Sequence, residues 1–229
     1  APVGDFSDAG VIALAVLQLS MLAAAGLRQW PFAVLATQAA TLLALLAAAV
    51  TDEVEPILAV VAVALLAVAA WAAAGFGKRW PTAHLHGPAG AASVFLVASL
   101  ALARMDVPEA WAWTALATGT LAGAAASVLP GARASLAWSG FALLVLWPIL
   151  HFEDSLVTPA VHVLLAALAT GIAVWRRNIL VHVAGMVVAA LALLLLFLFA
   201  AAQDTIDDQR LASSGVAAAI AMVALAQWW

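Results

Sequence analysis

Long apolar stretches make up most of the chain, and short clusters of charged residues, Pro and Gly separate them. Each stretch approaches the roughly 20 mostly apolar residues that a helix needs to cross a bilayer. None shows the period-two alternation of a membrane β-strand. We therefore expect an all-α polytopic bundle, forming one integral membrane domain over residues 1–229. The nine predicted spans are Ala9–Leu27, Pro31–Val50, Val54–Phe76, Gly87–Ala103, Pro108–Leu129, Arg133–Leu150, Val157–Trp175, Asn178–Ala202 and Leu211–Trp229.

Composition supports this membrane class. Apolar residues make up 67% of the chain and charged residues 9%, against roughly 25% charged in an average soluble domain. The mean hydropathy is +1.14. These values exclude a water-soluble enzyme and a nucleic-acid binder. The chain has no cysteine, which excludes disulfides, thiolate metal sites, iron–sulfur ligation and a cysteine nucleophile.

The charged residues predict the orientation. Nine spans define two sets of loops, and one set holds all twelve carboxylates. The other set, which includes the C-terminus, holds six of the eight basic residues; only Arg104 and Arg210 fall on the acidic side. The positive-inside rule then places the N-terminus outside and the C-terminus in the cytoplasm. The basic set is Arg28, Lys78, Arg79, Arg133, Arg176 and Arg177.

This orientation has consequences for location and partners. The expected location is the cytoplasmic (inner) membrane of a prokaryote. An acidic outer face would attract a basic soluble partner or cations, unless its carboxylates serve only to enforce topology. The chain opens without Met, which fits removal of either an initiator Met or a signal peptide.

No Asp, Glu, Lys or Arg lies near the middle of a predicted span. The polar residues expected inside the membrane are Gln18, Gln38, His162 and His182, with scattered Ser and Thr. A proton pump or ion-coupled transporter usually needs a titratable group at depth, so this chain alone is a poor candidate for either. Small residues such as Gly119-x-x-x-Gly123 let helices approach closely. They could pack within the chain or against other integral membrane subunits.

Histidines are the candidate ligands. His84 and His86 form an H-x-H pair without a third ligand, and we expect them in a cytoplasmic loop near solvent or lipid headgroups. His151 and His162 could face each other near the outer surface, close to Glu153 and Asp154. That group could bind haem or a metal, or exchange a proton. The alternative is that both imidazoles only bond to carbonyls or across helices.

His182 belongs to the opposite, cytoplasmic half of the membrane, so it cannot share a small site with His162. We expect it to contact lipid headgroups or cap a helix. No bound cofactor is required by the sequence, and haem is the alternative.

Two stretches resemble the hydrogenase-4 component E family. Gly26–Leu42 has that family's basic turn, followed by an apolar helix carrying a Gln and a small residue, here Gln38-Ala39. Gly171–Gly185 resembles its penultimate junction, and Gly87-Pro88 is a weaker likeness. Members of this family are membrane-arm subunits of formate-hydrogenlyase and complex I-like assemblies, beside antiporter-like proton-pumping subunits.

The chain also departs from that family. Its fifth and sixth spans are additional, and Ala190 stands near the place of an intramembrane Glu. No residue within Val61–Ala74 matches the family's third-helix Lys. The resemblance therefore implies a scaffolding position in an energy-converting complex, without proton chemistry or catalytic activity of its own. Two alternatives remain: a small-molecule or ion transporter, and a haem- or pigment-carrying electron-transfer subunit using His151 and His162.

Overall fold

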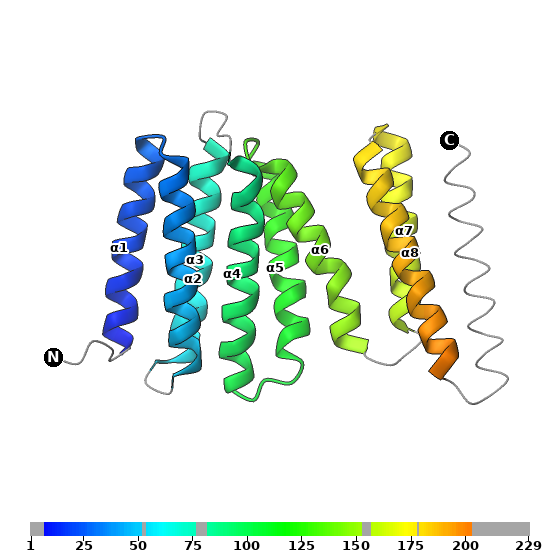
Figure 1. The fold of residues 1–229 in the computed structure, drawn as a ribbon, viewed down its shortest axis with the longest axis horizontal. Coiled ribbons are helices and arrows are strands. Elements are labelled where there is room, and N and C mark those ends of the chain that lie inside the picture. The colour runs from blue at the N-terminus through cyan, green and yellow to red at the C-terminus, as the bar shows by residue number, and fades with distance from the viewer. Residues whose placement is uncertain (1–6, 52–53, 77–81, 153–156, 178, 203–229) are drawn as a thin grey trace. The chain divides into compact units, whose positions relative to one another are not determined.

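The computed structural model describes residues 7–51, 54–76, 82–152, 157–177 and 179–202. These residues form eight helices and no strand (Figure 1). The all-α prediction is confirmed for this part of the chain, and the ninth predicted span, Leu211–Trp229, lies outside it. The helices are α1 (Asp8–Leu27), α2 (Pro31–Val50), α3 (Pro56–Phe76), α4 (Ala83–Arg104), α5 (Ala110–Val128), α6 (Arg133–Phe152), α7 (Val157–Arg176) and α8 (Ile179–Ala202).

Six helices in the described residues are long and apolar enough to cross a membrane. They are α1, α2, α3, α4, α6 and α8. The apolar part of α7 is shorter, Val157–Ala173. Helix α5 has 19 residues, but Ala, Thr and Gly replace the larger apolar side chains that its neighbours carry. The chain is thus an integral membrane protein by the length and composition of its helices.

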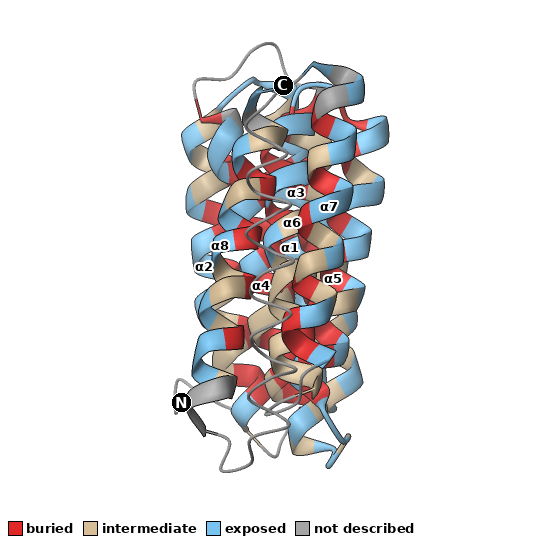
Figure 2. Ribbon diagram, turned by 90° about the vertical axis from the view of Figure 1, so that its right-hand side faces the viewer, coloured by how far each residue is buried: buried red, intermediate tan, exposed pale blue. Residues whose placement is uncertain are grey.

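Exposed side chains support a lipid surrounding. Exposed positions run along the helices over their whole length and are not confined to the ends (Figure 2). Many are large and apolar, such as Val16 and Met21 on α1 or Phe197 on α8. Water would penalise so many exposed apolar side chains, whereas lipid tails are as apolar as the side chains themselves.

The chain divides into two compact units, Ala1–Trp147 and Pro148–Trp229. The boundary falls inside α6, at a proline within the helix. In the first unit α4 packs against α2, α3 and α5, while α1 packs against α2 and α3. In the second unit α7 packs against α8, where a Cβ at Gly185 would lie 2.9 Å from Thr170 Oγ1.

Small residues set the spacing of the helices. Among the residues that the structure describes, Ala dominates the buried set and Trp71 is the largest side chain that is fully buried. Between α5 and α6 the backbones nearly touch: a Cβ on Gly140 would lie 2.7 Å from the Gly119 carbonyl oxygen. Gly119, from the predicted small-residue motif, therefore serves packing within the chain. A Cβ on Gly123 would meet nothing within 4 Å.

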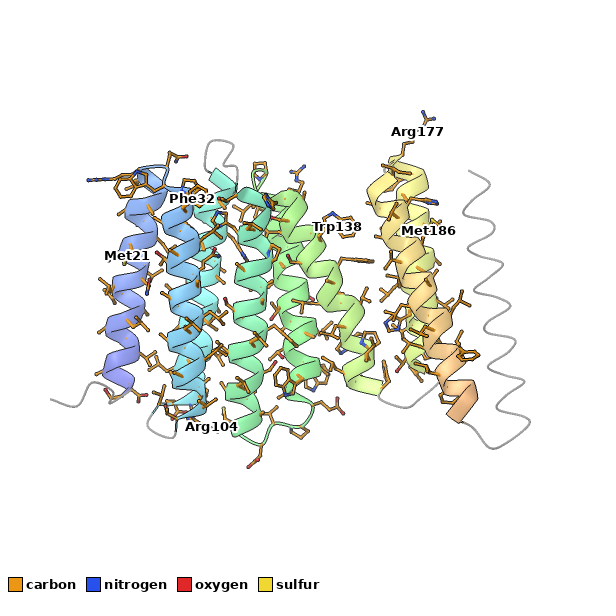
Figure 3. The ribbon with its side chains drawn as sticks, viewed as in Figure 1. Met21, Phe32, Arg104, Trp138, Arg177 and Met186 are labelled. Carbon is orange, nitrogen blue, oxygen red and sulfur yellow. The ribbon has the colours of Figure 1, made fainter. Side chains whose placement is uncertain are left out.

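The contacts of Arg104 give a structural reason for this basic residue to lie among the acidic loops. Its guanidinium donates to the carbonyls of Ala49, Thr51 and Val54, at the end of the first unit where α2 finishes and α3 begins (Figure 3). A cation near the end of a helix also suits the partial negative charge of the last carbonyls. A further hydrogen bond at this end links the residue before α3 to the start of α1: the Glu55 amide donates to the Asp8 carboxylate at 2.8 Å.

Candidate functional site

A buried cluster of hydrogen-bonded side chains in the first unit is centred on His86, whose exposed fraction is 0%. Its other members are Gln38 of α2, Trp71 of α3 and Thr82, the residue that precedes α4. We call these four residues the His86 cluster. It joins three neighbouring helices near the ends where α2 and α4 begin and α3 finishes.

Both ring nitrogens of His86 have defined partners. Nδ1 lies 3.0 Å from Gln38 Oε1, and Nε2 lies 3.1 Å from Thr82 Oγ1. An amide oxygen can only accept, so Nδ1 carries a proton and donates it. The Thr82 hydroxyl can donate to Nε2, so the two partners can satisfy both ring nitrogens of a neutral imidazole.

The backbone of His86 takes part as well. Trp71 Nε1 donates to the His86 carbonyl oxygen at 3.2 Å, and Gln38 Nε2 lies 3.5 Å from the same oxygen. Gln38 therefore contacts both the ring and the main chain of His86. These bonds satisfy polar groups that would be costly to bury unpaired.

Local sequence makes this approach possible. A Cβ at Gly90 would lie 2.3 Å from Trp71 Nε1, so only glycine lets the indole reach the His86 carbonyl. A Cβ at Gly87 would lie 2.7 Å from the Ser135 backbone and hydroxyl. Thr82 precedes the helix at the capping position, but its side chain makes no cap bond and turns to His86.

The structure corrects the prediction for His86. We expected His84 and His86 in a loop, with the helix beginning at Gly87. Helix α4 instead begins at Ala83 and contains Pro88, and His84 is exposed whereas His86 is buried. Because proline is favoured in the first turn of a helix, Pro88 led to a predicted start at Gly87. The bonds of His86 to Thr82 and Gln38 stabilise the additional turn of α4 that precedes Gly87.

The cluster is suited to holding helices together. Relaying a proton through His86 requires a second group that accepts the proton and releases another. The Gln38 amide oxygen accepts a hydrogen bond but carries no proton to pass on from that atom. The hydrogen bonds of the cluster join α2, α3 and α4 to one another.

His151 and His162, the candidates predicted near the outer surface, make contacts different from those of His86. His162 is fully buried, and its Nδ1 lies 2.7 Å from the Thr158 carbonyl oxygen, one turn earlier in α7. His151 packs edge-on against Phe152, with ring centroids 4.5 Å apart. Glu153 and Asp154 lie outside the described residues. Among the residues described, no three His, Asp or Glu side chains gather as a metal site would require.

The remaining polar residues fall in two groups. Gln18 and Gln38, which were expected inside the membrane, are buried within the protein, and Gln38 belongs to the His86 cluster. His182 is partly exposed near the start of α8. The sequence pattern did not reveal Thr82 and Trp71 as site residues, because Thr82 precedes the predicted helix start at Gly87 and Trp71 lies within an apolar stretch. The signal that could have revealed them was a pair of glycines, Gly87 and Gly90, at the start of a helix.

Comparison with known proteins gives no match: no protein-family model, curated protein or solved structure corresponds to this chain.

Proposed function

We propose that the chain is a noncatalytic scaffold subunit of a larger membrane complex, of the energy-converting hydrogenase or complex I-like, ion-translocating kind. Its role is to hold neighbouring integral subunits in place by close helix packing. The observation that carries this proposal is the His86 cluster. His86 is buried, and each of its ring nitrogens bonds to a side chain of the same unit. This arrangement supports a structural role for His86.

The family resemblance gives further support. Gln38 comes from the stretch Gly26–Leu42 that resembles hydrogenase-4 component E, and Gly87-Pro88 is a separate, weaker likeness. These two stretches are far apart in the sequence, yet Gln38 bonds to His86, the residue directly before Gly87. Gln38, which carries the resemblance, therefore belongs to the His86 cluster, and the weaker likeness begins at the residue that follows His86.

The proposed setting is the prokaryotic cytoplasmic membrane, crossed nine times with the N-terminus outside. In this orientation the His86 cluster lies in the cytoplasmic half, because α2 and α4 both begin on that side. Arg104 then lies at the outer end, where its bonds to three carbonyls give a basic residue a structural reason to be on the acidic side. The acidic outer loops would face a basic soluble partner or cations.

Purification with an affinity tag from native membranes in a mild detergent tests the proposal. We expect other integral membrane proteins to co-purify in fixed ratio, and mass spectrometry to identify antiporter-like subunits among them. A visible absorption spectrum of the same sample tests the electron-transfer alternative through His151 and His162. Recovery of the chain alone, with substrate transport after reconstitution, would contradict the scaffold proposal and favour a transporter.

A further inference from the structure

A cavity of about 10 Å³ lies beside the His86 cluster, between α1, α2, α3 and α4, and its lining is mostly apolar with three polar side chains. Its polar lining comes from Gln38 and Thr41 of α2 and Ser93 of α4, and its apolar lining includes Leu22 and Ala67. A cavity must leave roughly 10–15 Å³ open to a water-sized sphere before it can hold one water molecule.

Thr41 gives the cavity an unused hydrogen-bonding group. Its side chain is only 4% exposed, and Oγ1 is buried with no hydrogen-bond partner in the structure. A buried hydroxyl without a partner costs free energy. Thr37, one turn earlier on the same helix and also 4% exposed, donates instead to the Ala33 carbonyl at 2.8 Å.

The other two polar side chains can complete the coordination of a water. Ser93 Oγ donates to the Ala89 carbonyl at 2.7 Å, so its lone pairs can accept a hydrogen bond from a water. Gln38 uses Oε1 to accept from His86. One N–H of its amide nitrogen is directed at the His86 carbonyl oxygen, which leaves the other N–H to donate. A water here would accept from Thr41 or Gln38 and donate to Ser93, within the two to four bonds usual for buried water.

We propose that this cavity binds one ordered water molecule, held by Thr41, Ser93 and Gln38. The water extends the hydrogen-bond network of the His86 cluster from Gln38 to Thr41. It thereby joins polar groups of α2 and α4 about one helical turn further into the bundle than Gln38. Gln18 of α1 lies one turn from the cavity-lining Leu22, and its buried Oε1 likewise has no partner. This inference does not depend on the proposed function.

Solid-state NMR of the whole protein in lipid bilayers, with ¹³C-labelled threonine, tests the water site. Magnetisation is transferred from water to nearby side chains, and Thr41 is compared with Thr37. We expect transfer to Thr41 and only background at Thr37. Transfer to neither, or equal transfer to both, would overturn the proposal: the first means a dry cavity, and the second means solvent reaching the helix from its end.

A variant provides the second measurement. Ser93→Ala removes one partner of the water while leaving Thr41 and Gln38 unchanged. The transfer to Thr41 should fall toward the Thr37 background, because the water loses its acceptor. Full transfer to Thr41 in a folded Ser93→Ala protein would show that the water is not held at this site. The wild-type comparison stands even if the variant does not fold.

Discussion

At the residue scale, His86 shows what a linear pattern cannot reveal. A histidine two residues before a proline resembles a loop histidine, and only the folded chain brings Gln38 within 3.0 Å of its ring. Gln18 and Gln38 could be predicted to lie within membrane spans because they interrupt apolar stretches, but their burial against other helices was not predicted. Trp71 could not be placed, since tryptophan in such stretches usually marks the membrane surface.

Replacement of His86 should destabilise the protein. His86→Ala leaves Gln38 and Thr82 without their partner and opens a cavity, so we expect a loss of at least about 2 kcal/mol of folding free energy. His84→Ala, on the same helix but exposed, is the control and should change little. Equilibrium unfolding in mixed detergent micelles measures both, and equal effects would refute a structural role for His86.

Gly90 should tolerate no side chain. The Cβ of Gly90→Ala would lie 2.3 Å from Trp71 Nε1, so the indole must move and lose its bond to His86. We expect a cost of about 1–3 kcal/mol. Gly171→Ala, where nothing lies within 4 Å, should be neutral or slightly stabilising. Tryptophan fluorescence and unfolding of the two variants measure this difference; a neutral Gly90→Ala would disprove the close approach.

At the element scale, the sequence predicted most helix boundaries. The predicted Pro31–Val50 coincides with α2, and the predicted Ala9–Leu27 differs from α1 by one residue. Proline at the first position and a basic turn define these ends clearly. The predicted end of α4 differs from the observed one by one residue, but its predicted start at Gly87 was wrong because the start depends on contacts from other helices. The spacing of α5 and α6 likewise depends on Gly140, which the predicted Gly119-x-x-x-Gly123 motif does not contain.

Arg104 should hold the connection between α2 and α3. Arg104→Met preserves the length and apolar stem of the side chain but removes the donors to three carbonyls. We expect a loss of about 1–3 kcal/mol and faster proteolysis between α2 and α3. The matched control is Arg133→Met, since Arg133 is exposed at the start of α6. Proteolysis that is unchanged in Arg104→Met would contradict the assigned role.

At the scale of the whole molecule, charge sorting predicts an orientation that can be measured directly. The native chain has no cysteine, so single cysteines report their own accessibility. Asp106 and Arg133 are exposed at the two ends of the segment containing α5. We expect Asp106→Cys to react with an impermeant thiol reagent added outside intact cells, and Arg133→Cys to react only after permeabilisation. The opposite labelling would reverse the orientation.

The central claim is that this chain supports an ion-translocating assembly without taking part in the ion path. The most direct measurement is the number of ions translocated per turnover in membrane vesicles carrying His86→Gln, His162→Gln and His182→Gln together. Glutamine keeps hydrogen-bonding capacity but does not titrate near neutral pH. We predict the same ratio as in the wild type wherever the complex assembles. A large loss of translocation, with assembly and turnover preserved, would show that these histidines belong to the ion path and that the scaffold account is wrong.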